Sequence, residues 1–231
     1  IVDMFIDPAT YPNVTSLLFN EHEGSALVVA MSGLMTQTDK VGFVGGMDIP
    51  LINKFAAGYV FGANYTNEGI NYTIAYTNDW VDTNVGQTLA DGMYAAGTDV
   101  IFAAAGRSGL GVIDSAKANN ASHAYHTWAI GVDSPQMYLG CADPENPVAP
   151  TLVMTSMLKR VDIAVYSVIE QVHEGTYTGG LMFFSLSNGG IDFEINEDLL
   201  VIAPAIMSEV NDLKALIIAG FVVVPDEIYW T

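Results

Sequence analysis

The sequence predicts an α/β fold built on a parallel sheet. Between Lys40 and Gln136 the chain repeats one unit, in which an apolar strand, a short polar or glycine-rich turn and an amphipathic helix follow one another. The strands are continuous apolar runs, as in strands buried on both faces, and helical crossovers are what parallel neighbours require. Glycine and polar clusters follow each strand, at the edge where open parallel sheets bind ligands.

The individual elements follow from this pattern in order. Inside the repeat we expect strands at 41–44, 72–76, 100–105 and 128–132, with helices at 51–65, 85–96 and 110–119. Apolar runs before it predict strands at 1–6 and 14–19 and a helix at 21–35. The last third predicts a strand at 151–155, helices at 157–173 and 204–219, and a hairpin of 181–186 with 190–195 around a glycine turn.

Composition limits the classes of function. The chain has 231 residues, of which 51% are hydrophobic, so it can bury a full core. Its 26 acidic and 7 basic residues give a formal charge of −19, which repels nucleic-acid phosphates and anionic membrane surfaces. We therefore expect no nucleic-acid partner. The single cysteine, Cys141, excludes an internal disulfide and a multi-cysteine metal site, and no apolar run is long enough to cross a bilayer.

Catalytic and metal chemistry find little support in the sequence. Ser108 lies outside a Gly-x-Ser-x-Gly motif, so we expect no catalytic residue there. His123 and His126 have the spacing of a metal pair but no nearby cysteine or carboxylate cluster, so we expect no metal and no cofactor. Asp79 and Asp82 resemble an acid–base pair, although a capped helix start at Asp82 is the simpler explanation.

Several ordered motifs resemble one family. They are Lys40-Val-Gly-Phe-Val-Gly-Gly-Met-Asp-Ile-Pro50, the run from Gly97 to Gly106 followed by Gly109-Leu-Gly111, Ile130-Gly-Val-Asp133, and the segment from Thr155 to Asp162. Together they resemble the basic membrane lipoprotein (BMP) family, over nearly the whole chain. The resemblance implies a purine nucleoside receptor-like substrate-binding protein of an ABC importer, with a type I periplasmic-binding-protein fold.

The fold implied by the resemblance has two Rossmann-like lobes with parallel sheets. We expect residues 1–38 to be the remainder of the amino-terminal lobe and residues 39–155 to form the carboxyl-terminal lobe. Residues 156–178 would cross back to the amino-terminal lobe, and residues 179–231 would complete the carboxyl-terminal lobe. Family members carry a further segment before the matching part. We therefore expect an incomplete amino-terminal lobe that exposes apolar surface or is completed by another chain.

The resemblance also implies a set of ligand-binding residues. Trp80 occupies the place of an aromatic residue, usually phenylalanine, that stacks on the purine. Gly106 matches a glycine-rich loop near the ligand, and Asp133 and Lys159 match the pair that binds the ribose. Asp3 resembles the aspartate that pairs with the base edge. These residue types suit a nucleoside, which offers a flat π face, a hydrogen-bonding edge and vicinal hydroxyls.

Each of these residues also has a purely structural explanation. Trp80 could anchor its loop against the sheet, and Asp133 could cap a helix or form an Asx turn. Lys159, at a helix start, could pair with Asp162 or another surface acid. The loop from Gly106 to Gly111 could cradle a phosphate. Its spacing, however, fits neither the dinucleotide motif nor the P-loop, and a tight turn also explains it.

Three classes of function stay open. The first is an extracytoplasmic solute-binding protein of an ABC importer, which binds adenosine, guanosine or inosine in a cleft between the lobes. Such a protein would deliver its ligand to the transporter permease at the cell surface or in the periplasm, held by a lipid anchor in a leader. The second is a cytoplasmic nucleoside-sensing regulator on the same fold, and the third is a nucleotide-dependent enzyme that uses the Gly106 loop. The resemblance favours the first class.

Overall fold

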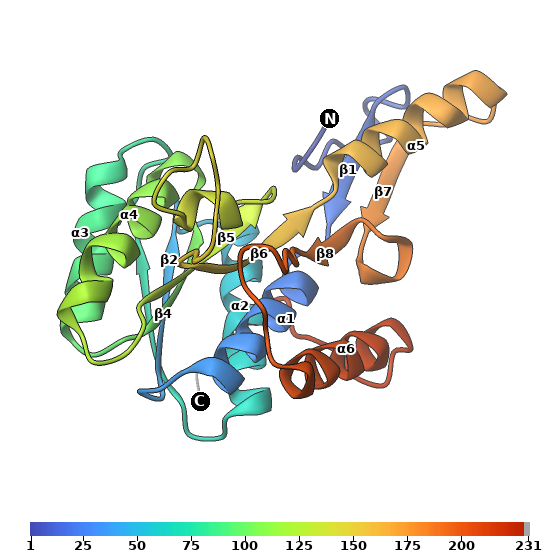
Figure 1. Cartoon of the computed structure of the whole chain (residues 1–231). Coiled ribbons are helices and arrows are strands. Elements are labelled where there is room, and N and C mark those ends of the chain that lie inside the picture. The colour runs from blue at the N-terminus through green and yellow to red at the C-terminus, as the bar shows by residue number, and fades with distance from the viewer. Residues whose placement is uncertain (229–231) are drawn as a thin grey trace.

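The computed structural model of the chain describes residues 1–228, which form two sheets. In spatial order the large sheet contains β3 (Asn71–Tyr76), β2 (Lys40–Gly45), β4 (Val100–Ala104), β5 (Trp128–Asp133), β6 (Val153–Lys159) and β8 (Ile191–Phe193). The small sheet pairs β1 (Thr15–Phe19) with β7 (Gly180–Phe184). Figure 1 shows the small sheet projecting from the body that the large sheet and its helices form.

The large sheet confirms the predicted α/β class. Its first five strands are parallel, and only β8 runs antiparallel to its neighbour. Side chains alternate between the two faces, so that Phe43 and Phe102 lie in one core while Val44 and Ile101 lie in the other. Because both faces are covered, the central strands β2, β4 and β5 are apolar at most successive positions, which explains the continuous runs in the sequence.

Helices cover both faces of the large sheet. One face carries α1 (Glu21–Met35), α2 (Pro50–Thr66) and α6 (Pro204–Ile218), and the other carries α3 (Thr83–Ala95) and α4 (Gly109–Asn119). Short 3₁₀ helices within residues 1–228 are η1 (Gly106–Ser108), η2 (Asn120–Ser122), η3 (Met137–Gly140) and η4 (Leu186–Asn188). The helices α1 and α2 approach closely because Gly58 and Gly62 on α2 lie against the carbonyls of His22 and Ala26, where any Cβ would overlap the backbone.

The small lobe consists of β1, β7, α5 (Val161–Glu174) and the first residues of the chain. Val2 forms a parallel bridge with Leu17 in β1, so the strand predicted over 1–6 is reduced to this bridge. Within residues 1–228 the chain passes between the lobes at three places, from β1 into α1, from β6 into α5, and from β7 through η4 to β8. Glu21 and Lys159 therefore stand at the first two of these crossings.

The structure corrects several boundaries predicted from the sequence. The helix α1 packs on α2 and α6, so the first small-lobe segment ends at Asn20, not at residue 38. The strand β7 belongs to the small sheet, so the segment from 179 does not begin in the large lobe. The predicted hairpin is wrong: β7 pairs with β1 and β8 with β6, because the capped turn η4 separates the two strands. The strand β6 continues to Lys159, so the helix predicted from 157 begins at Val161.

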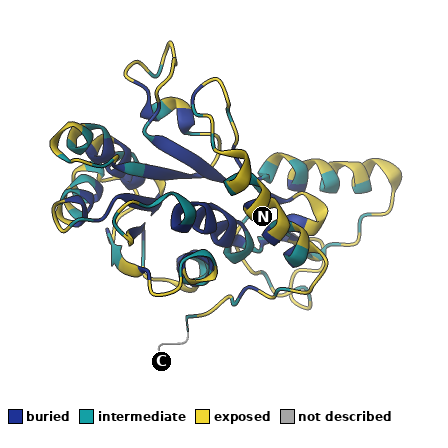
Figure 2. Cartoon of the chain, turned by 60° about the horizontal axis from the view of Figure 1, so that its bottom comes forward, coloured by how far each residue is buried: buried dark blue, intermediate teal, exposed yellow. Residues whose placement is uncertain are grey.

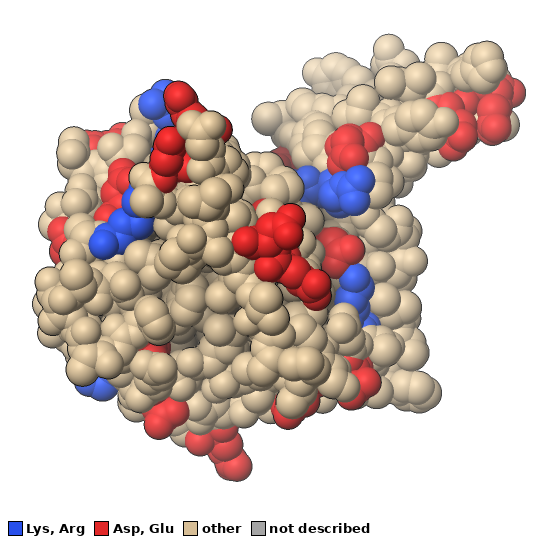
Figure 3. Space-filling model, viewed as in Figure 1, with Lys and Arg blue, Asp and Glu red and all other residues tan. Residues whose placement is uncertain are grey.

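The surface of the molecule is acidic, as the composition predicts. In Figure 3 acidic side chains form patches across the face shown, whereas Lys and Arg appear at few places. No helix among residues 1–228 is both long and apolar enough to cross a membrane.

Candidate functional site

A cavity of about 220 Å³ opens at the carboxyl ends of β4, β5 and β6. Its lining includes every ligand-binding residue that the resemblance implies, namely Asp3, Trp80, Gly106, Asp133 and Lys159. The carboxyl ends of parallel strands lie at the same edge of a sheet, so residues far apart in the sequence meet there. The small lobe contributes Asp3, and the large lobe contributes the rest of the lining.

Lys159 is the charged centre of the cavity. Its side chain is 5% exposed, its Nζ donates a hydrogen bond to Asp3 Oδ2 at 2.9 Å, and the same Nζ lies 3.1 Å from Glu21 Oε1. The ammonium also lies 5.3 Å from the ring centroid of Phe19 and 5.5 Å from that of Phe55. Carboxylates and aromatic faces thus replace the water that this cation loses on burial.

The charges around Lys159 set the protonation states of the cavity. Burial acts to lower the pKa of Lys159, but the carboxylates of Glu21, Asp133 and Asp3 outweigh it, so the pKa lies above its ordinary value. The ammonium is therefore charged at neutral pH. Loss of solvent raises the pKa of Asp133, the charge of Lys159 opposes this rise, and Asp3 adds to it. Asp133 nevertheless keeps contact with solvent at the cavity, where its carboxylate can accept hydrogen bonds.

The ion pairs differ from those expected at Lys159. Its partners within residues 1–228 are Asp3 and Glu21, and Asp162 pairs instead with Arg160 at 2.8 Å. The alternative of a Lys159–Asp162 salt bridge is therefore wrong. It depended on a helix start at Lys159, whereas this residue ends β6 and points its ammonium at the cavity edge.

Two aspartates of the cavity have left-handed backbone conformations. The φ angle is 57° at Asp3 and 68° at Asp133. Aspartate adopts this region more readily than most residues, yet such a conformation still costs free energy and concentrates at functional sites. Asp3 follows the bridge at Val2, and Asp133 ends β5. In both places the left-handed residue ends the extended segment next to the cavity.

Trp80 forms the aromatic wall. Its ring lies so close to Gly46 that a Cβ there would overlap the indole, and it also lies against Gly106, whose φ is 56°. The carbonyl of Trp80 accepts hydrogen bonds from the amides of Arg107 at 3.0 Å and Ser108 at 3.3 Å. The residue is held in place by these contacts and yet remains 41% exposed, so its indole offers a surface to the cavity.

The same hydrogen bonds argue against a phosphate site in the Gly106 loop. The amides that would cradle a phosphate are already bonded to the Trp80 carbonyl. Ser108 is buried and donates its hydroxyl to the carbonyl of Asp79 at 3.0 Å. Asp79 accepts the amides of Val81 and Asp82, which lowers its pKa, and Asp82 caps α3 through the amide of Asn84. These polar groups hold the loop in shape.

Sequence reasoning missed several residues of the site. Glu21 begins α1, one residue after Asn20, and its burial beside Lys159 depends on the fold and not on a local sequence pattern. The apolar lining from Leu51, Ile52 and Phe55 comes from the first turns of α2. Glu194 is buried and accepts hydrogen bonds from the amides of Gln136 and Met137, so it fixes the loop that follows Asp133.

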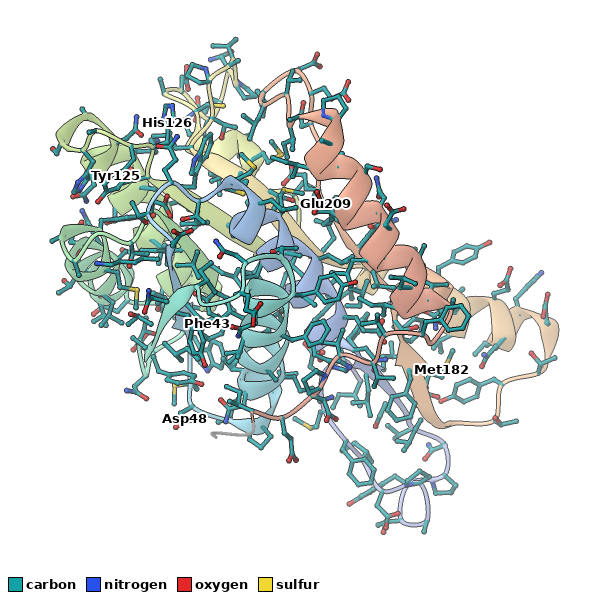
Figure 4. The ribbon with its side chains drawn as sticks, turned by 90° about the horizontal axis from the view of Figure 1, so that it is seen from below. Phe43, Asp48, Tyr125, His126, Met182 and Glu209 are labelled. Atoms are coloured by element: carbon teal, nitrogen blue, oxygen red, sulfur yellow. The ribbon has the colours of Figure 1, made fainter. Side chains whose placement is uncertain are left out.

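Other features of the surface lie away from this cavity. A larger cavity of about 550 Å³ beside β3 and the start of α2 is lined by Asp48, Asn53 and Tyr76, and contains none of the predicted ligand residues. His126 contacts Asn120 in the loop before β5, and Figure 4 shows it far from Asp48. Within residues 1–228 no group of three or more His, Cys, Asp or Glu could hold a metal ion.

Comparison with known proteins agrees with the resemblance found in the sequence. The model of a family described as ABC transporter substrate-binding protein PnrA-like matches residues 1–227. The ABC transporter nucleoside-binding protein BmpA of Lactococcus lactis subsp. cremoris is 34% identical over 218 residues, which cover 93% of this chain and 61% of that protein. Basic membrane protein D of Borreliella burgdorferi is 33% identical over 228 residues, covering 97% and 63% of the two chains.

A solved structure supports the same fold. An ABC transporter system solute-binding protein from Aeropyrum pernix K1 matches with a TM-score of 0.76 and 28% identity, over 93% of this chain and 67% of that one. This similarity confirms the type I periplasmic-binding-protein-like α/β fold. The chain spans about three fifths of the length of the curated relatives, 61% and 63% of the two named above.

Proposed function

The chain belongs to the PnrA-like family of ABC transporter substrate-binding proteins, and on that premise we propose that its 220 Å³ cavity binds a purine nucleoside. One observation carries the proposal. An exposed indole, a solvent-accessible carboxylate and a buried ammonium, from Trp80, Asp133 and Lys159, line the same small space. A flat base and a sugar with vicinal hydroxyls need this combination of groups.

The proposed ligand pose follows from the chemistry of each group. The base stacks on Trp80, an interaction worth about 1 to 3 kcal/mol. The ribose hydroxyls donate to Asp133, in charge-assisted bonds worth about 1.5 to 3 kcal/mol each. An ammonium has three N–H donors. In Lys159 one N–H goes to Asp3, and Nζ also lies 3.1 Å from Glu21 Oε1 in an ion pair, which leaves donor capacity for a ribose oxygen.

Charge favours a nucleoside over a nucleotide. The carboxylates of Asp3, Glu21 and Asp133 surround Lys159, and a second cation, Lys54, lies 4.0 Å from Glu21. Three negative groups against two positive ones repel a phosphate that has little solvent around it. The bonded amides of the Gly106 loop offer no compensating donors. A neutral ligand therefore fits this site better than a phosphorylated one.

The cellular role follows from the family. We propose that the protein acts outside the cytoplasm, in the periplasm or at the cell surface, and passes adenosine, guanosine or inosine to the permease of an ABC importer. The ligand lies in the cleft between the lobes, and a lipid anchor in a leader holds the protein at the membrane. The family consists of substrate-binding proteins, and no observation on the cavity favours an enzyme or a cytoplasmic regulator.

A thermal-shift panel tests this function. The ligands are adenosine, guanosine, inosine, cytidine, the free purine bases and the purine nucleoside monophosphates, with any flanking sequence of a longer protein restored. A ligand that binds only the folded state raises its stability by RT ln(1 + [L]/Kd). We expect the largest shift from a purine nucleoside and a smaller shift from the free base. A larger shift from a monophosphate, or no shift from any purine nucleoside, would contradict the proposal, and chromatography of the ligand afterwards detects turnover.

A further inference from the structure

Glu21 is a buried carboxylate beside the cavity that the proposed ligand does not reach. It is 0% exposed and is the first residue of α1, one residue after Asn20, where the chain leaves β1. Its Oε1 lies 3.1 Å from Lys159 Nζ, and its Oε2 lies 4.0 Å from Lys54 Nζ. No hydrogen bond of standard geometry reaches either oxygen from any group in residues 1–228. Two ammonium groups are therefore the charged neighbours that offset its burial.

Burying a charged carboxylate costs free energy of folding unless nearby groups interact favourably with its charge. Burying an ion without hydrogen bonds costs several kcal/mol, in contrast to an exposed acid at the same helix start. Burial raises the pKa of Glu21, while the charge of Lys159 and then that of Lys54 oppose the rise. The positive end of the α1 dipole also favours the charged form. The burial of Glu21 is therefore offset in part by the lysine of the cavity, which is 3.1 Å away.

The two carboxylates that contact Lys159 differ in exposure and in the lobe that carries them. Asp3 has a 29% exposed side chain and lies on the first segment of the chain, which pairs with β1 of the small lobe through the bridge at Val2 and its neighbouring hydrogen bonds. Glu21 lies on α1, whose middle is fully buried against α2 and the large sheet. Lys159 itself emerges from the large sheet at the end of β6. The contact between Glu21 and Lys159 therefore joins two fixed elements of one lobe, whereas the contact with Asp3 depends on the other lobe.

We propose that Glu21 is the positioning residue that holds the Lys159 ammonium in place, with one N–H left facing the ribose. Glu21 does not touch the ligand, and its effect acts through Lys159. The inference rests on the proposed function only in naming the ligand as a ribonucleoside. If Glu21 served folding alone, its loss would lower stability without changing how the cavity discriminates between sugars.

The first test needs no ligand. The sequence holds five lysines, so protein labelled with ¹⁵N-lysine gives few side-chain NMR signals, and Lys159→Met identifies the signal of Lys159. Glu21→Gln keeps the shape of the side chain and removes its charge. We expect Glu21→Gln to shift the Lys159 Nζ signal or to broaden it through faster exchange with water. An unchanged signal would overturn the proposal.

Glu23→Gln is the matched control. It removes the same charge from the same helix turn, but Glu23 accepts hydrogen bonds from the Leu186 amide and the Asn20 side chain instead of contacting Lys159. We expect this variant to leave the Lys159 signal in place. If Glu21→Gln does not fold, Glu21→Asp keeps the charge and withdraws it by one methylene, and it too must shift the signal.

The second test measures discrimination between sugars. A purine ribonucleoside and its 2′,3′-dideoxy analogue are titrated into the parent, Glu21→Gln and Glu23→Gln proteins. We expect Glu21→Gln to lose about tenfold in affinity for the ribonucleoside, the size of one charge-assisted hydrogen bond, and to change little for the analogue. In a Lys159→Met background the Glu21→Gln change should have no further effect on the ratio. Equal losses for both ligands would contradict the proposal. A parent that binds no nucleoside refutes the proposed function, and the NMR signal then decides the role of Glu21 separately.

Discussion

The two lobes of the molecule differ in how completely they bury their apolar side chains. In the large lobe, helices cover both faces of a six-stranded sheet, and Phe43 at its centre is 0% exposed. In the small lobe, two strands and one helix leave Phe183 57% and Tyr166 64% exposed. Figure 2 shows the contrast between the dark core strands and the exposed projecting helix. This agrees with the expectation of exposed apolar surface on the lobe that contains β1.

This difference indicates that the large lobe supplies most of the stability and most of the binding site. A two-stranded sheet with little covered surface is marginally stable by itself, whereas a sheet covered on both faces holds a full core. The cavity takes nine of its ten lining residues from the large lobe and Asp3 from the small one. We infer that the large lobe supplies a preformed wall, while the small lobe adds a contact that depends on its own position.

The largest expected effect is on the stability of the large lobe. Phe43 contacts the rings of Tyr59, Tyr76 and Phe102. Phe43→Ala should lower the free energy of unfolding by about 3 to 5 kcal/mol, because it leaves a cavity in a closed core. The matched change Phe183→Ala in the small lobe should stay within about 0.5 kcal/mol. Urea denaturation followed by circular dichroism compares the two variants, and similar losses would show that the lobes do not differ in this way.

The next effect concerns which lobe carries ligand affinity. Asp133→Ala should weaken nucleoside binding by about 2 to 4 kcal/mol, because the ribose loses its charged acceptor. Lys159 keeps Asp3 and Glu21 as partners in that variant. Isothermal titration calorimetry measures the loss, with Asp143→Ala on an exposed loop as the control. Unchanged affinity in Asp133→Ala would refute its role.

A smaller effect tests the close packing of helices in the large lobe. A Cβ at Gly58 would overlap the backbone of His22, so Gly58→Ala should cost about 1 to 3 kcal/mol of stability as α1 and α2 move apart. Gly92 on α3 has open space around it, and Gly92→Ala should be neutral or stabilising by about 0.5 to 1 kcal/mol. Thermal unfolding of both variants checks the sign. A neutral Gly58→Ala would mean that the helix contact is loose.

The parallel core could be predicted because its pattern is local. The central strands β2, β4 and β5 are nearly continuous apolar runs followed by turns, so strand type and the ligand edge follow from short segments. The connection between lobes could not be predicted in this way. In β7, Leu181 and Phe183 alternate with more buried residues, a pattern that suits a hairpin as well as the observed parallel pairing with distant β1.

In the candidate site, too, some features follow from local sequence patterns and others depend on distant elements. The positions of Asp133 and the Gly106 loop at strand ends followed from the pattern, whereas the ligand roles of all five residues, Trp80, Asp3 and Lys159 included, depended on the family resemblance. Glu21 was overlooked because an acid in the first turn of a helix is ordinary, and only the fold reveals that it is buried against Lys159. Burial of a charge depends on elements that are far apart in sequence, so no local pattern shows it.

The central claim is that the cavity on the large lobe stacks a purine on Trp80. Calorimetric titration of the preferred nucleoside into Trp80→Ala and Trp80→Phe proteins, with any flanking sequence restored, tests it most directly. We expect Trp80→Ala to lose about 1 to 3 kcal/mol of binding free energy, and Trp80→Phe to bind nearly as tightly as the parent because it keeps an aromatic face. Binding by Trp80→Ala as tight as that of the parent would contradict the claim.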